Sequence, residues 1–267
     1  MRLSPTARAL PALFRIGFAE AVAYRAEFFV WMLSNTMPLI MLALWSAVAR
    51  EGPVGRFGQK EFVAYFLATF IVRQLTASWV AWQMNFEIRQ GTLARRLLRP
   101  IPVMLALGVE NIAAQPMRLL VAVPAAGVWL WAVGAGQLPG DPVLWAAFAA
   151  AIVGGWLITF LASFAIGSLA FFMESSVKVM DIWLALYFVL SGYLVPIELF
   201  PPAVRAVAGW LPFRHQIGLP VELITSSHDR ATALALLGQQ WIWVAAMLGG
   251  ALVLWRRGLA RFAAYGG

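Results

Sequence analysis

Six long apolar runs, separated by short charged segments, constrain this sequence more than any other feature. Each run approaches the roughly 20 residues that a helix needs to cross the hydrocarbon core of a bilayer. Inside hydrocarbon, every backbone amide must bond within the protein, so the runs are predicted to be helices. Hydrophobic residues make up 62% of the chain and charged residues 12%, whereas about a quarter of a soluble domain is charged. The predicted spans are residues 28–49, 62–84, 116–133, 143–172, 179–199 and 236–255.

The six transmembrane helices predict an all-α integral membrane protein that forms a single transmembrane domain over residues 1–267. The net charge of +8 does not indicate nucleic-acid binding, because the basic residues lie in short clusters between the spans. If the N-terminus is cytoplasmic, the cytoplasmic segments carry roughly twice as many basic residues as the outer ones, with Arg118 counted among the cytoplasmic ones. This asymmetry predicts that both termini lie in the cytoplasm.

Residues 4–26, before the first span, are predicted to form an amphipathic helix. Apolar residues recur there at helical spacing: Leu10, Leu13, Phe14, Gly17, Phe18 and Ala21. Arg8, Arg15 and Glu20 fall largely on other faces. Such a helix is expected to lie in the membrane interface with its arginines toward lipid phosphates. It serves either as a topology anchor or as a packing surface for a partner.

Residues 87–99 are predicted to contain a short cytoplasmic helix between the second and third spans. Thr92 is a good N-cap because its hydroxyl can accept a hydrogen bond from an amide two or three residues later. Gly91 permits a sharp turn before it, and Pro100 disfavours helical geometry in the preceding residue. The expected helix has an apolar stripe and basic residues on its other faces: Leu93, Leu97 and Leu98 against Arg95, Arg96 and Arg99. The alternative is an ordinary basic loop that obeys the positive-inside rule.

Two stretches resemble the permease subunits of type-2 ABC exporters. "FEIRQGTLARRLLRPIP", residues 86–102, has that family's order of a glutamate, Gly-Thr-Leu and a leucine-rich stretch ending near proline. "SGYLVPIELFPPAVRAVAGWLPFRHQIGLPVELI", residues 191–224, resembles the outer end of the family's fifth span and the re-entrant hairpin that follows it. The six spans, the N-terminal helix and the chain length agree, so the resemblance covers nearly the whole chain. The second stretch is similar to the branch whose permeases are often encoded as unlike pairs beside one ATPase gene.

The resemblance implies that residues 87–99 contain the coupling helix that docks on a partner ATPase. The coupling residues would be Glu87, Gly91, Thr92, Leu93, Arg95, Arg96, Leu97 and Arg99. The sequence has no G-x-x-x-x-G-K-[ST] phosphate loop, so two copies of a separate ATPase subunit are expected to bind ATP and Mg²⁺. This chain is expected to hold no cofactor or metal.

The resemblance also implies a setting and a cargo. A second permease subunit, identical or related, is expected to complete the transporter in the bilayer of a bacterial inner membrane. The transporter would export an amphiphilic or lipid-like molecule, which could be a drug, peptide, lipid or glycan.

Polar residues in and near the second span predict a substrate path or a subunit seam. Arg73 and Gln74 lie near the middle of the span, and Trp79 follows them. A guanidinium at this depth costs several kcal/mol and usually faces a partner or a cavity. Arg73 either lines the conduit and attracts a phosphate or carboxylate of the substrate, or forms an ion pair or caps carbonyls at a seam. Trp79 either lines the path or belongs to the lipid-facing aromatic belt.

The outer end of the fifth span is predicted to act as a gate. Gly192 and Pro196 loosen the helix there, and irregular backbone is tolerated at membrane depth only where protein or water covers it. The predicted gate consists of Ser191, Gly192, Pro196, Phe200 and Pro201, beside the re-entrant hairpin at residues 201–219 that the resemblance implies. Alternatively, Pro196 only kinks a packed helix.

The opposing functional class is a membrane-embedded enzyme that modifies lipids. Its candidate acid–base groups are His215, Glu222, His228 and Asp229. The sequence contains no HExxH, serine-based or paired-carboxylate motif. It also contains no cysteine, which excludes disulfides, thiolate metal ligands and cysteine nucleophiles from this chain. The sequence therefore favours a transport subunit.

Overall fold

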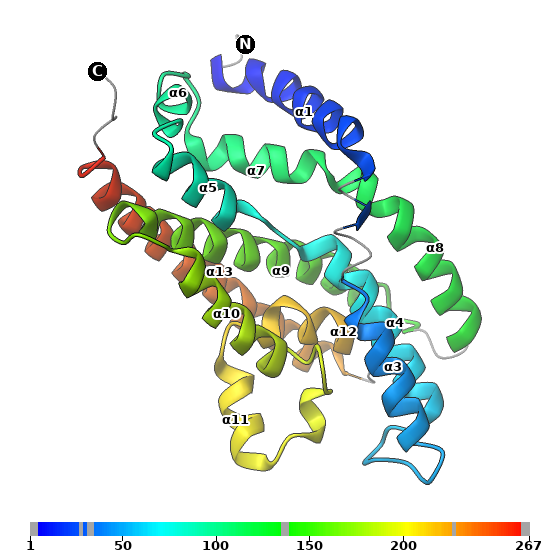
Figure 1. Cartoon of the computed structure of the whole chain (residues 1–267). Coiled ribbons are helices and arrows are strands. Elements are labelled where there is room, and N and C mark those ends of the chain that lie inside the picture. Colours follow the sequence, from blue (N-terminus) through cyan, green and yellow to red (C-terminus); the bar gives the residue numbers. More distant parts are fainter. Residues whose placement is uncertain (1–4, 27–28, 31–34, 135–138, 226–227, 263–267) are drawn as a thin grey trace.

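The computed structural model describes residues 5–26, 29–30, 35–134, 139–225 and 228–262 (Figure 1). In these ranges the chain forms helices joined by turns and loops, without a β-strand, so the all-α prediction is confirmed. The helices are α1 (Pro5–Ala23), α3 (Met37–Val48), α4 (Gln59–Thr76), α5 (Val80–Arg89), α6 (Leu93–Leu97), α7 (Val103–Ala113), α8 (Gln115–Val133), α9 (Pro142–Ser168) with η2 (Leu169–Phe171), α10 (Val177–Leu190), η3 (Ile197–Leu199), α11 (Pro202–Trp210), η4 (Arg214–Gln216), α12 (Gly218–Thr225) and α13 (Arg230–Leu259).

Among the described residues, four helical segments are long and apolar enough to cross a bilayer. They are α4 with α5, α8, α9 with η2, and α13, at the positions of the predicted second, third, fourth and sixth spans. Part of the predicted first span coincides with α3, and residues 28 and 31–34 of that span lie outside the described residues. The predicted fifth span overlaps α10, whose 14 residues extend about 21 Å against a hydrocarbon core of roughly 30 Å. The six-span topology stays a prediction.

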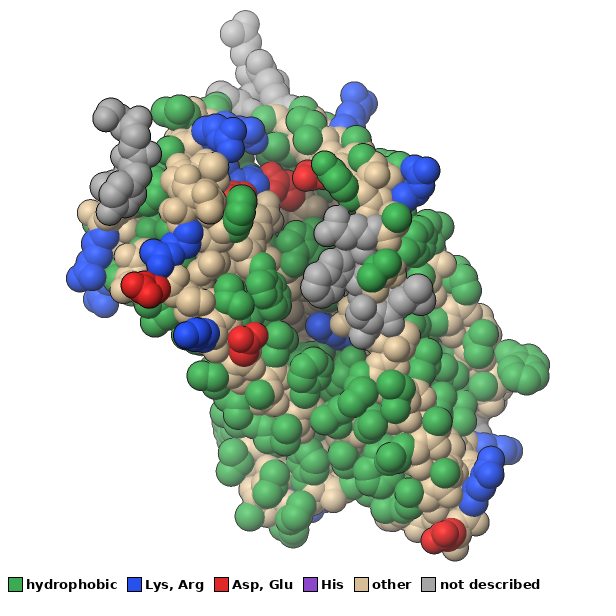
Figure 2. All heavy atoms as spheres, viewed as in Figure 1, with side chains coloured by type: hydrophobic (Ala, Val, Ile, Leu, Met, Phe, Trp, Pro, Cys, Tyr) green, Lys and Arg blue, Asp and Glu red, His purple; other side chains and the backbone are tan. Residues whose placement is uncertain are grey.

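The helix α9 lies at the centre of the bundle. It packs along α13 on one side and against α5, α4 and α12 on others (Figure 1). In its most apolar stretch 61% of the residues are buried, against 17% for α13. The outward residues of α13 are largely hydrophobic, including Trp241 and Ile242. Figure 2 shows hydrophobic side chains over most of the lower part of one face, with charged side chains mainly over its upper half and at its lower right edge, which suits a surface partly embedded in lipid.

The chain folds back into the bundle after α11. Most of α11 is exposed, whereas α12 is buried and packs against α9 and α4. Gly155 of α9 allows this packing, because a Cβ atom there would lie 2.8 Å from the carbonyl oxygen of Gln216. Gln240 of α13 donates to the carbonyl oxygens of Ala151 and His215, at 2.8 Å each. The predicted hairpin at 201–219 therefore comprises α11, the turn and the start of α12, and its re-entry into the membrane stays a prediction.

The predicted N-terminal helix is present as α1 and packs against α7 (Figure 1). Leu13 and Gly17 are buried in this contact, and a Cβ atom at Gly17 would lie 3.0 Å from Cβ of Ala113. Ile16 is 63% exposed on another face. The helix thus has a packing partner within its own chain and keeps an exposed apolar face, which suits a position in the membrane interface.

Candidate functional site

A tight reversal between α5 and α7 displays the short helix α6. The second span ends with α5 at Arg89, and Gly91 then adopts a φ of +70°. This left-handed conformation favours glycine because it has no Cβ atom. The helix α6 covers five residues, Leu93–Leu97, and Pro102 directly precedes α7. The predicted segment 87–99 therefore consists of the end of α5, a glycine turn and a single helical turn.

Arg96 joins α6 to both neighbouring helices. Its Nε and Nη2 donate to the Glu87 carboxylate of α5 at 2.6 and 2.8 Å. Its Nη1 and Nη2 donate to the Glu110 carboxylate of α7 at 2.6 and 3.0 Å. Gln83 also donates to both carboxylates, at 3.3 Å each. We call this set of four side chains the Arg96 brace, and it fixes the position of α6 relative to the second span and α7.

The Arg96 side chain is only 16% exposed. Burial disfavours its charge, but the hydrogen bonds from its guanidinium to Glu110 and Glu87 outweigh burial and raise the pKa of Arg96 above its ordinary value. Arg96 therefore remains charged, and its bidentate contacts orient it strictly. The resemblance implied that Arg96 contacts the partner, whereas in the structure its guanidinium points inward to Glu87 and Glu110.

Two further expectations about α6 are wrong. Thr92 makes no capping hydrogen bond, because it already has helical dihedral angles and its hydroxyl lies 3.5 Å from the Glu87 carbonyl. The leucines form no single stripe, because Leu93 is fully buried whereas Leu98 is 87% exposed. A helix of five residues is too short to carry a continuous face over residues 93–98.

The outward surface of α6 combines two arginines with two leucines. It consists of Arg95, Leu97, Leu98 and Arg99, which we call the α6 outer face; all four are exposed. Leu97 and Arg99 also border a shallow pocket with Trp255 and Leu259 of α13. The outer face thus lies beside the C-terminal end of α13.

The second span is broken in its middle. The helix α4 ends at Thr76, Ala77 is extended with φ −67° and ψ 146°, and α5 begins at Val80. Broken helices inside a membrane leave backbone carbonyls that need new donors. Arg118 of α8 supplies one, since its Nη1 donates to the carbonyl oxygens of Gln74 at 3.2 Å and Ala77 at 2.6 Å.

Other polar side chains also form hydrogen bonds to the residues of the break. Gln115 donates to the carbonyl oxygen of Leu75 at 3.0 Å. Asn111 of α7 donates to the Ser78 hydroxyl at 3.4 Å and accepts from Trp156 of α9 at 2.8 Å. Side chains of α7 and α8 thus bond directly to the break, and α9 supports it through the hydrogen bond from Trp156 to Asn111.

The position of Arg118 corrects the charge count made from the sequence. Arg118 is 4% exposed and lies inside the bundle, so it is not a loop charge. Its place two residues after the start of the predicted third span was the available signal. The sequence could not show its acceptors, which lie about 40 residues earlier in the chain.

Arg73, Gln74 and Trp79 all flank this break. The Arg73 guanidinium lies 5.2 Å from the ring centroid of Tyr187 on α10, and the Arg73 Nε is buried without a hydrogen-bond acceptor. Gln74 is 3% exposed. The Trp79 ring centroid lies 5.0 Å from Cζ of Arg118. The structure therefore brings the three predicted residues to one region and adds Tyr187 and Arg118 to it.

The predicted gate residues lie after α10 in an irregular segment that is tied to α3 and α4. Tyr65 donates to the Gly192 carbonyl oxygen at 2.7 Å, and Trp45 donates to that of Leu194 at 3.1 Å. Ser191, Gly192 and Pro196 are buried, Phe200 is half-buried and Pro201 is exposed. Protein covers the irregular backbone near Gly192, as its position in the predicted span requires.

A comparison with family models now identifies the chain. Residues 33–266 match the model described as ABC-2 family transporter protein. This chain belongs to the ABC-2 transporter family. No curated protein matches it. As an ABC-2 permease, it is a multi-pass membrane subunit of an ABC transporter and works with an ATPase partner.

The candidate acid–base groups of the ABC-2 permease are only partly brought together. Glu222 is buried and paired with Arg214 at 2.6 Å, and His228 Nε2 lies 3.8 Å from the same carboxylate. The ring nitrogens of His215 have no hydrogen-bond partner among the described residues. Asp229 is exposed at the start of α13. The nearest acidic partner of His228 is therefore already neutralised by an arginine.

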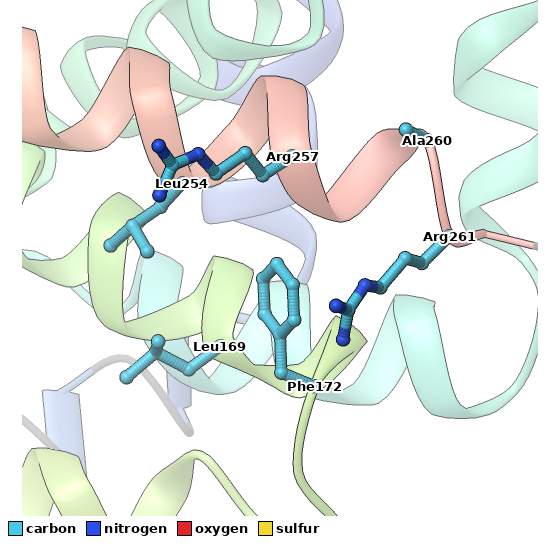
Figure 3. A pocket seen from close by; sticks show the side chains of 6 residues that line it. All are labelled: Leu169, Phe172, Leu254, Arg257, Ala260 and Arg261. Carbon is cyan, nitrogen blue, oxygen red and sulfur yellow. The ribbon is translucent and has the colours of Figure 1, made fainter.

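The ABC-2 permease also has an open pocket of about 450 Å³ where η2 meets the end of α13 (Figure 3). Its walls are largely apolar, and two basic side chains reach it, Arg257 and Arg261. The Arg261 guanidinium lies 5.0 Å from the ring centroid of Phe172.

Proposed function

We propose that this chain is the permease subunit of an ATP-driven exporter and that α6 is the helix that docks on the ATPase. Its family membership supports a permease with an ATPase partner. The proposal for α6 rests on how the helix is held. The Arg96 brace binds it to α5 and α7 on its inner side, and the α6 outer face stays exposed for a partner. The arginines of that face suit acidic groups across an interface.

Two ATPase subunits would bind ATP and Mg²⁺ beneath two permease subunits, which are identical or related. When the ATPases close, they push on α6, and the brace passes this movement to α5 and α7. Since α5 continues the second span, the movement reaches the break at Ala77–Trp79 and the path beside Arg73. The irregular segment after α10 then opens outward. The cargo is an amphiphilic molecule taken from the cytoplasm or the inner leaflet of a bacterial inner membrane, with both termini of the permease cytoplasmic.

Co-purification tests this proposal. A tagged permease is expressed with its neighbouring genes, and ATPase retained on the tagged subunit is measured for wild type and Leu98→Asp. We expect Leu98→Asp to lose most of the ATPase, because Leu98 is 87% exposed at the proposed docking face. Leu234→Asp is the matched control, since Leu234 is 52% exposed at the other end of α13. Retention of ATPase by Leu98→Asp at the wild-type level would contradict docking through α6.

A further inference from the structure

The broken second span gathers two arginines inside the bundle. Arg118 of α8 is almost fully buried, and Arg73 lies in the last turn of α4. Arg118 bonds to the carbonyl of Gln74, the residue next to Arg73, and the two positive charges repel each other. Two guanidinium groups thus lie within electrostatic reach of each other, one buried and one half-buried.

No carboxylate compensates these charges within the described part of the chain. Every ion pair found there involves other arginines or His228. The carbonyl end of α4 offers only about half a negative charge against two positive ones. A buried charge without a partner is strongly unfavourable, so this region favours an anion.

Unused hydrogen-bond donors lie at the same place. The Nε of Arg73 is buried and has no acceptor. The hydroxyl of Tyr187, on a side chain that is 2% exposed, interacts with the Arg73 guanidinium, and its ring lies 5.2 Å from that group. A guanidinium can only donate, so the O–H of Tyr187 has no acceptor among the described residues. Buried polar groups normally find partners, so the unused donors of Arg73 and Tyr187 indicate a missing acceptor. Arg118 holds the break with Nη1 and contributes its charge to this region.

We propose that Arg73 and Tyr187 bind the anionic head group, a phosphate or a carboxylate, of the exported amphiphile, and that Arg118 strengthens this site electrostatically. The site lies between the second and fifth predicted spans, beside the break that the ATPase-driven movement of α6 would reach. This inference rests on the proposed export function and narrows its cargo to amphiphiles with an anionic head group.

The test uses the purified permease–ATPase complex and native mass spectrometry. The probes are dodecyl phosphate, dodecanoate and the neutral dodecyl glucoside, each at the same concentration. We expect the complex to retain one or both anionic probes in preference to the glucoside. Arg73→Gln should weaken retention of the anionic probes about tenfold, the factor that corresponds to about 1.4 kcal/mol.

Two further variants keep the test decisive. Tyr187→Phe keeps the ring and removes a hydroxyl that donates to no acceptor among the described residues, so it should fold normally and still reduce retention of the anionic probes. Arg257→Gln removes a charge from the pocket in Figure 3 and should leave retention unchanged. Anion retention that survives Arg73→Gln and Tyr187→Phe, or that disappears with Arg257→Gln, would overturn the site.

The remaining outcomes distinguish a head group from free phosphate as the bound anion, and they distinguish failure of this site from failure of the proposed function. Complete displacement of dodecyl phosphate by an equal concentration of inorganic phosphate would show a site for free phosphate and refute a head-group site. Equal retention of the glucoside would refute anion selectivity. Failure of the proposed function appears differently, as loss of the ATPase from the complex, whereas failure of this site leaves an intact complex without anion preference.

Discussion

Replacing Arg96 with glutamine removes the guanidinium that joins Glu87 of α5 to Glu110 of α7. Arg96 makes four hydrogen bonds to these carboxylates, between 2.6 and 3.0 Å. Glutamine is shorter and uncharged, so it cannot bridge both. The variant leaves two carboxylates close together with only the amide of Gln83 between them.

The size of the effect follows from burial. Removing one partner of a buried ion pair costs about 3–5 kcal/mol, and the 16% exposure of the Arg96 side chain lets water relieve part of that cost. We therefore expect the local stability of α6 to fall by about 3 kcal/mol, which raises its opening equilibrium about a hundredfold. The cost falls on α6, because α5 and α7 have other contacts within the bundle.

Hydrogen–deuterium exchange measures this opening. The backbone amides of residues 93–98 in the purified permease, without the ATPase, should exchange about a hundredfold faster in Arg96→Gln than in wild type. Arg95→Gln is the matched control, because it removes the same charge from the neighbouring position, where the side chain is exposed. The reasoning is refuted if Arg96→Gln exchanges like wild type, or if the two variants accelerate exchange equally.

Two further predictions concern packing and pH. Gly155→Ala places a methyl group 2.8 Å from the Gln216 carbonyl oxygen and should lower the free energy of unfolding by about 1–3 kcal/mol. Gly249→Ala is the control, because its methyl group meets open space and should not lower the stability. Thermal unfolding of the solubilised protein compares the two variants. The hydrogen bond from Arg230 lowers the pKa of Asp141 below its ordinary value. The pair therefore contributes its full stabilisation at a pH above the ordinary aspartate pKa, and this stabilisation is lost as the pH falls through the lowered pKa of Asp141. Asp141→Asn should therefore lose stability at neutral pH and become less acid-sensitive, and an unchanged acid transition would argue against the pair.

Local patterns in the sequence were sufficient for much of the fold. Hydropathy located the four long spans, because the need to keep polar groups out of hydrocarbon acts on each segment by itself. The turn at Gly91 followed from backbone sterics and the end of α6 from prolines, which are also local. The spacing of Leu13 and Gly17 indicated the buried face of α1.

The errors came where distant residues decide the outcome. The sequence around Ala77 contains neither glycine nor proline, so nothing local marks the break in the second span. Threonine is a favourable residue type for an N-cap, but Thr92 adopts helical dihedral angles and its side chain makes no capping hydrogen bond. Arg118 was counted among the cytoplasmic charges because a charge count does not distinguish an arginine that faces lipid phosphate from one that bonds buried carbonyls.

The sequence by itself determined a helical membrane protein, the place of α6 between two spans and an arginine at membrane depth. Only the tertiary structure decided that Arg96 faces inward, that Leu98 faces outward, and that Arg73 lies with Tyr187 beside a break sustained by Arg118. The physical reason is that hydrophobicity and backbone sterics act within a segment, whereas the direction of a charged side chain depends on acceptors that packing brings from other helices.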